Sequence, residues 1–314
     1  MNKTKTGVFG VGSLGQWHAR VYSELESCDL VGVYDIDADR AAEIAEKYNT
    51  KPFSDMDELA AAIEAASVVV PTDKHFETFS HLIQHDIHML IEKPIAVTTA
   101  EAVEMSKQAQ EKNLALQVGH IERFNPVMNF LEDNLTRARF VEATRLAPYP
   151  PAREGGLPRG TEVSVVLDLM IHDLEIILHI VGSEVKAVNA TGVAVLSPTE
   201  DIANVRLSFE NGCVANVTAS RISMEQLRKI RVFQDDTYVS LDYSKQAGSI
   251  SKKTATGIDV AEVPIDKGDA LEAELGSFIH CVQHKKDPVV TGEHASRALE
   301  LAVEICRLIR ENPS

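Results

Sequence analysis

A glycine-rich turn near the N-terminus constrains the fold more than any other feature of this sequence. Gly10-Val-Gly12-Ser-Leu-Gly15 follows a short strand-like run and opens a helical segment. In this setting the glycines let a diphosphate approach backbone N–H groups at the N-terminus of a helix. Asp35 ends the next predicted strand, 20 residues beyond Gly15, where a carboxylate accepts hydrogen bonds from ribose hydroxyls. The sequence therefore predicts a dinucleotide site, and the second acid at Asp37 favours NAD because it would repel the 2′-phosphate of NADP.

Residues 5–119 carry the alternating pattern of βαβ units. Short β-branched runs alternate with helical stretches rich in Ala, Glu and Lys, which predicts a parallel sheet. We expect strands at residues 6–9, 29–34, 67–70, 88–91 and 115–118. We expect helices at 15–27, 37–48, 55–65, 74–85 and 99–112, with N-caps at Asp37 and at Thr98 or Thr99. This part is predicted to be an NAD-binding Rossmann domain over residues 1–121.

The pattern changes after Pro126. The alternating strands 203–209 and 213–221 meet across Asn211-Gly212, which is the strongest short hairpin signal. In the first of them apolar and polar residues alternate, so the sheet has one covered face and one open face that could meet water or a second subunit. We therefore predict an α/β protein with a second, α+β domain over residues 122–314, which has a large, mostly antiparallel sheet for substrate binding and oligomerisation. The final helix, 293–311, could return to pack on the first domain.

Composition excludes several classes of function. The chain has 314 residues and a formal net charge of −16, which opposes binding to nucleic-acid phosphates or to anionic lipid. It contains neither an apolar run of the ~18 residues that a spanning helix needs nor the pattern of a signal peptide at its N-terminus. We expect a cytoplasmic protein without a nucleic-acid or membrane partner. The four cysteines show no CxxC spacing, which argues against a zinc knuckle or a redox pair.

Two segments carry candidate chemistry. Glu92-Lys93-Pro94 directly follows the strand 88–91, at the sheet edge where open α/β folds bind ligands, and Pro94 holds Lys93 extended. On the almost wholly apolar helix 165–181, Asp168, His172, Glu175 and His179 form one stripe. Asp168 can orient His172 for proton transfer near neutral pH. The alternative is that the stripe is the solvent face of the helix, and we favour that alternative for Glu175 and His179.

The other histidines do not predict a metal site. His81, His85 and His88 have near-helical spacing, as do His280 and His284. No third carboxylate or cysteine ligand accompanies them in the sequence, so surface or capping roles are favoured. We expect no metal.

Taken together, these motifs resemble the glucose–fructose oxidoreductase, inositol dehydrogenase and rhizopine-catabolism (Gfo/Idh/MocA) family. The resemblance rests on the glycine turn with His18, on Pro71-Thr-Asp-Lys-His75, on Glu92-Lys93-Pro94 and on Asp168-Leu-Met-Ile-His172, and it covers nearly the whole chain. It implies that Lys93 and His172 handle the proton with Asp168 in support, and which of the two is the base stays open. It also implies NAD contacts from Gly10, Gly12, Ser13, Leu14, Gly15, Asp35, Pro71, Thr72, His75, Glu92 and Lys93.

Finer features are similar to one branch of that family. Residues 118–126 and 218–223 resemble members that oxidise the 3-hydroxyl of UDP-N-acetylglucosamine or its uronic acid, which feeds transamination to a 3-amino sugar for lipid A or surface polysaccharide. This implies a nucleotide-sugar substrate, a homodimer or homotetramer, and substrate contacts from Lys93, His120, Arg123, Asn125, Arg153, Arg159 and His172. Guanidinium groups suit a diphosphate, although ordinary surface arginines are the alternative for Arg123, Arg145, Arg153, Arg159 and Arg221. Two other functions stay open, namely a dehydrogenase of a free sugar or polyol such as inositol, and a non-catalytic, NAD-gated sugar-binding regulator.

Overall fold

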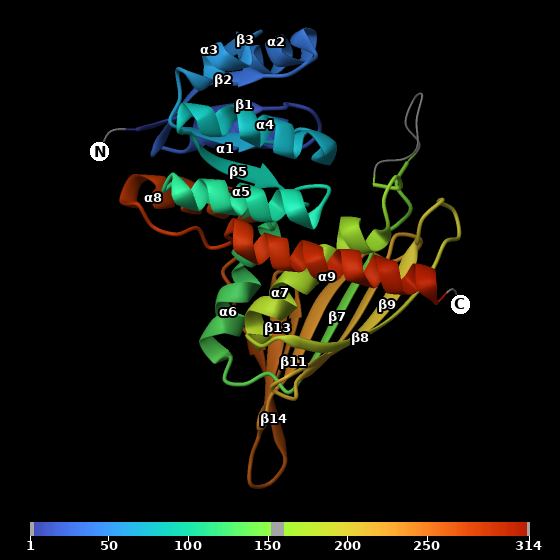
Figure 1. Ribbon diagram of the computed structural model, residues 1–314. Coiled ribbons are helices and arrows are strands. Elements are labelled where there is room, and N and C mark those ends of the chain that lie inside the picture. The colour runs from blue at the N-terminus through green and yellow to red at the C-terminus, as the bar shows by residue number, and fades with distance from the viewer. Residues whose placement is uncertain (1–2, 152–159, 313–314) are drawn as a thin grey trace. The chain divides into compact units, whose positions relative to one another are not determined.

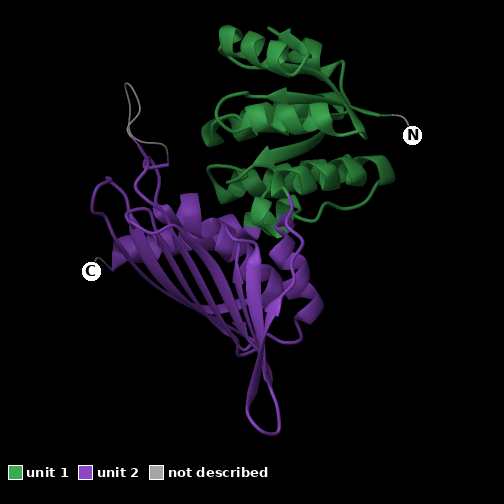
Figure 2. Cartoon of the chain, turned by 180° about the vertical axis from the view of Figure 1, so that it is seen from behind, with its two compact units in different colours: residues 1–123, 269–296 green, residues 124–268, 297–314 purple. Residues whose placement is uncertain are grey.

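The computed structural model describes residues 3–151 and 160–312. The chain divides into two compact units (Figure 2). The first unit contains Met1–Arg123 and Asp269–Ser296, and the second contains Phe124–Gly268 and Arg297–Ser314. In the described part of the chain, no helix is both long and apolar enough to cross a membrane.

The described part of the first unit is built on a parallel sheet of six strands in the order β3-β2-β1-β4-β5-β6. This is the order of a dinucleotide-binding Rossmann sheet, in which the direction of winding reverses between β1 and β4. The strands are β1 (Thr4–Phe9), β2 (Cys28–Tyr34), β3 (Lys51–Phe53), β4 (Ala65–Val68), β5 (His88–Glu92) and β6 (Leu116–Gly119). The helices are α1 (Gly15–Glu24), α2 (Ala38–Lys47), α3 (Met56–Ala60), α4 (His75–Leu82), α5 (Thr99–Glu111) and α8 (Ala270–His284), with short 3₁₀ segments η1 (Thr72–Lys74), η2 (Ile83–His85) and η3 (Ile121–Phe124) (Figure 1).

The predicted parallel sheet and helix caps are confirmed. Asp37 accepts hydrogen bonds from two N–H groups of the first turn of α2, and Thr98 forms a capping box with Glu101 at the start of α5. The edge strand β3 is missing from the prediction because it has only three residues and contains Pro52, which cannot donate to a ladder. The helix predicted over 55–65 ends at Ala60, because the buried run that forms β4 begins at Ala65.

The two compact units are not continuous in sequence, because α8 belongs to the first unit. Its Leu275, Phe278 and Ile279 are buried in the same core cluster as Val8 of β1 and Tyr22 of α1. Burial of this apolar stripe stabilises α8 against the sheet. The first residues of the last helix also belong to the first unit, which extends to Ser296, and Oγ of Ser296 lies 3.4 Å from Oγ of Ser106 in α5. From Arg297 onward, α9 (Gly292–Glu311) belongs to the second unit.

The described part of the second unit contains an eight-stranded sheet in the order β14-β13-β12-β11-β7-β10-β9-β8. Its pairs are antiparallel except for β7 with β10, and the predicted hairpin joins β9 to β10. The prediction of a mostly antiparallel sheet is confirmed. The strands are β7 (Phe140–Leu146), β8 (Val185–Val193), β9 (Ile202–Phe209), β10 (Val214–Ser220), β11 (Leu227–Phe233), β12 (Thr237–Asp242), β13 (Ala247–Lys253) and β14 (Ile258–Val263). The helical segments are α6 (Pro126–Asn134), the π-helical turn η4 (Val166–Met170), α7 (Ile171–Val181) and the greater part of α9.

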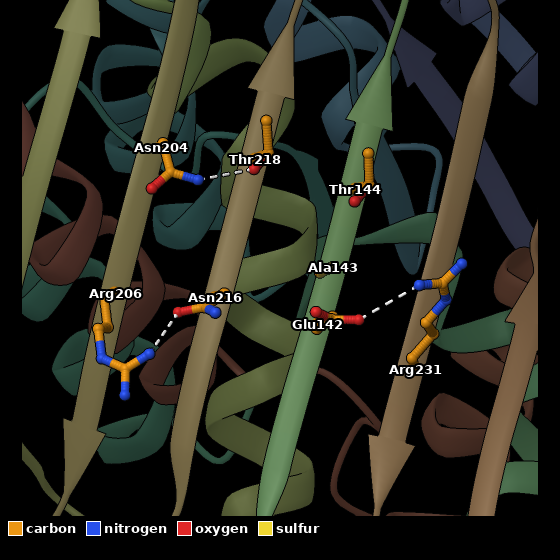
Figure 3. A pocket seen from close by; sticks show the side chains of 8 residues that line it. All are labelled: Glu142, Ala143, Thr144, Asn204, Arg206, Asn216, Thr218 and Arg231. Atoms are coloured by element: carbon orange, nitrogen blue, oxygen red, sulfur yellow. Dashed lines mark hydrogen bonds and ion pairs between the residues drawn. The ribbon is translucent and has the colours of Figure 1, made fainter.

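The two faces of this sheet differ as the alternation in β9 predicts. Val205, Leu207 and Phe209 are buried, and α7 packs on that side of β10. The opposite face carries polar side chains that bond across neighbouring strands (Figure 3): Asn204 donates to Thr218 at 2.8 Å, Arg206 donates to Asn216 at 3.1 Å, and Arg231 lies 3.3 Å from Glu142. A shallow polar hollow lies over these pairs.

Candidate active site

The turn between β1 and α1 leaves room for a diphosphate. Gly10 has a φ of +85°, and a Cβ there would lie 2.7 Å from the carbonyl oxygen of Val69. A Cβ at Gly15 would lie 1.8 Å from the carbonyl oxygen of Gly10, so these two glycines are needed for the turn itself. Gly12 is different, because no atom of the described chain lies within 4 Å of a Cβ built there. Gly12 therefore keeps open the approach to the N–H groups at the start of α1, beside the exposed Ser13 and Leu14.

Asp35 lies at the end of β2 with its carboxylate oriented by the backbone. Its Oδ2 accepts a hydrogen bond from the N–H of Val11 at 2.7 Å, and its Oδ1 accepts one from the N–H of Asp37 at 3.0 Å. Each carboxylate oxygen has a second lone pair for a hydroxyl group. A cation that could attract a 2′-phosphate is already engaged, since Arg40 pairs with Glu43 at 2.7 Å and donates to the carbonyl of Val11. The turn and Asp35 thus fit the pyrophosphate and the adenosine ribose of NAD.

Lys93 follows β5 directly, and its side chain is half-buried. The peptide bond between Lys93 and Pro94 is cis. The ring of His75 lies under this segment, with Nδ1 2.9 Å from the carbonyl oxygen of Pro94 and Nε2 3.0 Å from that of Val70. Burial lowers the pKa of His75, and the hydrogen bonds to backbone carbonyls oppose this shift. Because both ring nitrogens face backbone carbonyls and the residue is buried, His75 holds the loop after β4 against the segment of Lys93. The direct contact of His75 with NAD stays a prediction.

Glu92 is an anion at the same strand end. Its Oε1 lies 3.3 Å from Nε2 of His18, and its Oε2 accepts a hydrogen bond from the N–H of Lys93 at 3.2 Å. Burial by itself would raise the pKa of Glu92, but the hydrogen bond from His18 and the charges of His18 and Lys93 outweigh burial and lower it. A Cβ at Gly119 would come within 2.9 Å of this carboxyl group, so Gly119 makes the space that it occupies. Glu92 thus has an electrostatic role beside Lys93, and its direct contact with NAD stays a prediction.

His18 connects this anion to two polar residues that the sequence analysis missed. Its Nδ1 lies 3.0 Å from Oγ of Ser67, which also lies 2.9 Å from the hydroxyl of Tyr22. All three residues are buried. The spacing of His18 and Tyr22 on one face of α1 is the feature of the sequence that could have indicated this network. Their shared partner, Ser67 of β4, lies 45 residues or more away in the sequence, so no local pattern includes it. The network fixes the position of the Glu92 carboxylate relative to the sheet.

A second carboxyl group lies in the same region of the first unit. Glu274 of α8 is fully buried, and neither of its oxygens has a hydrogen-bond partner among the described residues. Burial and the charge of Glu92 raise its pKa well above the usual value. Glu92 therefore stays charged while Glu274 holds its proton. No local sequence pattern distinguishes Glu274 from the other acidic residues of the chain.

His120 and Arg123, which were predicted to contact substrate, are also buried. Burial and the positive charge of Lys93, with a smaller contribution from Arg123, lower the pKa of His120 to about 3. His120 is consequently a neutral imidazole at any physiological pH. Such a ring can donate one hydrogen bond and accept another, but it cannot supply a proton by titration.

Asp168 and His172 belong to the second unit, where the predicted continuous α-helix over 165–181 is interrupted. Residues Val166–Met170 form a π-helical turn, and α7 begins at Ile171. Turns of this kind occur frequently at functional sites. Asp168 and His172 are both half-buried, and a Cβ at Gly160 would lie 2.4 Å from Oδ2 of Asp168. The close approach of Gly160 and its φ of +83° explain the glycine at that position.

The rest of the predicted polar stripe divides in two. His179 is exposed and lies 3.0 Å from Glu132, which confirms its expected solvent-facing position. Glu175 is only 2% exposed, so its assignment to the solvent face is wrong. Only Asp168 lies in the π-helical turn, so the turn shifts Asp168 relative to the other three residues of the stripe. His172, Glu175 and His179 all lie in α7, where the packing of the helix decides which of them is buried.

Three residues proposed for substrate contact have their side chains engaged within the second unit. Asn125 caps α6 by accepting from the N–H of Val127 at 3.3 Å, and it donates to the carbonyl of Tyr243 at 3.1 Å. Arg145 makes a two-pronged ion pair with Asp173 at 2.8 and 3.1 Å, and both side chains are buried.

Arg221 is likewise buried in a network of its own. It donates to Asp201 at 2.8 Å and also to Thr199 and to the carbonyls of Gly160 and Val163. The expectation that Arg145 and Arg221 bind a diphosphate is therefore replaced by structural roles. Arg153 and Arg159 lie outside the described residues.

Comparison with known proteins is consistent with this geometry. Residues 4–120 match the oxidoreductase family with an NAD-binding Rossmann fold, and residues 132–239 match the Gfo/Idh/MocA C-terminal domain. The chain is 36% identical to UDP-N-acetylglucosamine 3-dehydrogenase of Acidithiobacillus ferrooxidans over 96% of each chain. A solved structure of that enzyme covers 99% of both chains with a TM-score of 0.93. Myo-inositol 2-dehydrogenase of Thermotoga maritima is 25% identical over 99% of this chain and 97% of its own.

Proposed function

The chain belongs to the Gfo/Idh/MocA family of NAD-dependent oxidoreductases, and from this premise we propose that it oxidises the 3-hydroxyl of UDP-N-acetylglucosamine or a closely related UDP-sugar. The observation that carries the proposal is the 36% identity over nearly the full length to an enzyme of that name. The inositol dehydrogenases among the relatives are 23–25% identical. The product is a 3-keto sugar, which is a substrate for transamination toward an amino sugar.

The residues of the first unit hold the cofactor in this proposal. The N–H groups after Gly12 receive the pyrophosphate, and Asp35 accepts hydrogen bonds from the adenosine ribose. When bound, NAD supplies the acceptor for the hydride that leaves C3. Pro71 and Thr72 lie at the start of the segment after β4, where they border the same edge of the sheet. His75 and Glu92 fix the backbone and the charge around Lys93.

We assign the proton transfer to Lys93 and His172, with Asp168 orienting His172. One of the two accepts the proton of the 3-hydroxyl as the C–H bond breaks, and the other donates a hydrogen bond to the developing oxyanion. The Glu92 carboxylate favours the charged form of the Lys93 ammonium, because opposite charges at close range stabilise each other. The neutral ring of His120 leaves Lys93 without a competing cation at that position.

We also propose a cytoplasmic homodimer or homotetramer. The open face of the second unit's sheet and its edge strand β14 support this assembly. On β14 the apolar side chains Ile258 and Val260 are 72% and 69% exposed, and large exposed apolar groups on a sheet edge favour contact with another chain. Light scattering at micromolar concentration should give a mass of two or four chains, and a monomer would refute the proposal.

The decisive experiment measures NADH formation from NAD with UDP-N-acetylglucosamine, its uronic acid, UDP-glucose and inositol. Mildly alkaline buffer and a carbonyl trap are needed because oxidation of an alcohol by NAD is unfavourable at neutral pH. Turnover with one UDP-sugar alone supports the proposal. Turnover with inositol alone identifies a polyol dehydrogenase. If none of these compounds gives NADH although the protein binds NAD, the protein is a binding or regulatory protein.

Substitution of the proposed proton carrier tests the mechanism. Lys93→Ala should lower kcat by at least about 100-fold, which is the scale of general acid–base catalysis. Lys107→Ala is the matched control, because Lys107 is an exposed lysine on α5 of the same unit. Near-normal turnover of the Lys93 variant would dismiss the assigned role.

A further inference from the structure

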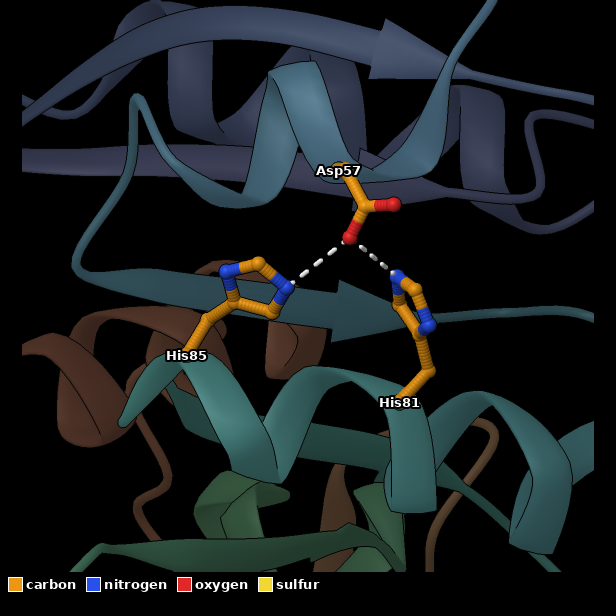
Figure 4. Close-up of side chains that lie close together, drawn as sticks. All are labelled: Asp57, His81 and His85. Carbon is orange, nitrogen blue, oxygen red and sulfur yellow. Dashed lines mark hydrogen bonds and ion pairs between the residues drawn. The ribbon is translucent and has the colours of Figure 1, made fainter.

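A cluster outside the dehydrogenase site brings together two imidazoles and a carboxylate. His81 and His85 lie one helical turn apart, at the end of α4 and in η2. The Nε2 atoms of both rings lie 3.0 Å from Oδ1 of Asp57 in α3 (Figure 4). The expectation that no carboxylate accompanies these histidines is therefore wrong. The fold brings Asp57, which lies in α3 between β3 and β4, next to both rings.

The contacts inside the cluster differ from an ordinary hydrogen-bonded triad. His85 is hydrogen-bonded to Asp57. The Nε2 atom of His81 is shielded from solvent, yet among the described residues it has no hydrogen-bond partner of acceptable geometry, although Oδ1 is only 3.0 Å away. The Nε2 atom of His81 therefore lies near the same carboxylate oxygen as Nε2 of His85, but it forms no hydrogen bond there. The side chains of His81, His85 and Asp57 are 37%, 30% and 64% exposed, so the centre is open to an ion from solution.

We propose that Asp57, His81 and His85 bind a divalent transition-metal ion of the zinc class. The three ligand atoms lie within 4.8 Å of one another. In a tetrahedral zinc site with bonds of about 2.0–2.2 Å, neighbouring ligand atoms are about 3.3 Å apart. The two nitrogen–oxygen distances of 3.0 Å therefore need to open by only a few tenths of an ångström. Water completes the coordination on the exposed side.

The chemistry of the donor set supports a zinc-class ion over calcium or magnesium. Imidazole nitrogen is a preferred ligand of zinc, nickel and copper, whereas calcium and magnesium take oxygen ligands. The net charge of −16 favours binding of any cation. An ion at this position would link α3 to the end of α4, so that binding stabilises the folded state of the first unit.

A second pair of histidines in the chain is a control for the four-residue spacing of His81 and His85. His280 and His284 of α8 also lie four residues apart, with stacked rings whose centroids are 4.0 Å from each other. Among the described residues, only the cluster around Asp57 assembles three ligand atoms. If the pair spacing were sufficient, both histidine pairs would bind metal equally well. If the carboxylate is required, only the cluster at Asp57 binds tightly.

The test is a calorimetric titration of ZnCl₂ into the full-length, untagged protein after removal of metal by a chelator. We expect one Zn²⁺ per chain and a raised melting temperature. Asp57→Ala and His85→Ala should each weaken binding by at least about tenfold, since even loss of a residue that only supports a ligand costs 10–100-fold. The double variant His280→Ala/His284→Ala should bind as the unchanged protein does.

Several outcomes would overturn the proposal. These are no saturable binding in excess ZnCl₂, binding that survives Asp57→Ala and His85→Ala, or binding that is lost in the double variant of α8. Circular dichroism and NAD affinity of the variants show whether they are folded. Replacing zinc by Co²⁺ adds a direct readout, because a tetrahedral site gives an intense visible spectrum and an octahedral ion held by water does not.

Discussion

The buried carboxyl group of Glu274 provides a sharp test of the charge assignment at the end of β5. Glu274 is fully buried, has no hydrogen-bond partner among the described residues, and lies in the field of the Glu92 anion. Burial and that field raise its pKa well above the usual value. In the unfolded chain the same group titrates near pKa 4.3. The native state therefore binds more protons than the unfolded state at every pH between these two values.

This difference fixes the sign of the pH dependence. Because the native state holds the extra proton, a rise in pH above about 4.3 destabilises the protein until the native pKa is reached, by up to about 1.4 kcal/mol per pH unit. Glu274→Gln keeps the size of the side chain and cannot ionise. The variant and the unchanged protein should have equal free energies of unfolding near pH 4. The variant should become progressively more stable than the unchanged protein as pH rises, and the gap should level off above the native pKa.

Urea unfolding followed by tryptophan fluorescence measures this gap. The single tryptophan, Trp17, lies on α1 of the same unit as Glu274. Glu272→Gln is the control, because Glu272 is exposed on the same helix, and it should change stability by no more than about 0.5 kcal/mol without a pH trend. A free-energy difference for Glu274→Gln that stays constant from pH 4 to pH 8 would refute the reasoning, since it would mean that Glu274 ionises in the native state as it does in the unfolded chain.

Asp35→Ala should raise the Kd for NAD by at least about tenfold, or about 1.4 kcal/mol, and an unchanged Kd in calorimetry would remove Asp35 from the site. Gly12→Ala should weaken NAD binding with little change in melting temperature, whereas Gly15→Ala should lower the melting temperature because its Cβ would lie 1.8 Å from a carbonyl oxygen; the reverse pattern would contradict the assigned roles. Arg145→Met should cost about 3–5 kcal/mol in urea unfolding by removing the buried ion pair with Asp173. The double variant Arg145→Met/Asp173→Leu should recover most of that loss, and a double variant as unstable as the single one would count against the argument.

Local patterns predict the elements that this fold repeats. The parallel strands of the first unit and the β9–β10 hairpin follow from alternation, β-branched runs and turn residues, all of which act within a few residues. The errors fall where a distant part of the chain decides the outcome. The assignment of α8 to the first unit depends on Leu275 and Phe278 meeting the core around Val8, and no local pattern distinguishes that from packing on the second unit.

The candidate site shows the same division at the level of side chains. The glycine turn, Asp35 and Lys93 are predictable because each is fixed by its position at the end of a strand. The arginines are not predictable in this way, because Arg145 pairs with Asp173 across 28 positions of sequence. The sequence does not show whether the guanidinium group of an arginine binds a diphosphate or pairs with a carboxylate inside the protein.

The protonation state of a buried carboxyl group depends on the surrounding packing even more than the position of the side chain does. Glu92 and Glu274 are the same residue type in the same unit, yet one stays charged and the other keeps its proton. The difference arises because His18 and the N–H of Lys93 bond to Glu92, whereas the buried Glu274 carboxyl has no hydrogen-bond partner among the described residues and lies in the field of a like charge. A carboxylate pair of this kind places a single negative charge beside Lys93, because ionising the second group would bury an unpaired charge. The electrostatic setting of Lys93 is therefore decided by three segments that lie far apart in the sequence, and only their packing in the first unit specifies it.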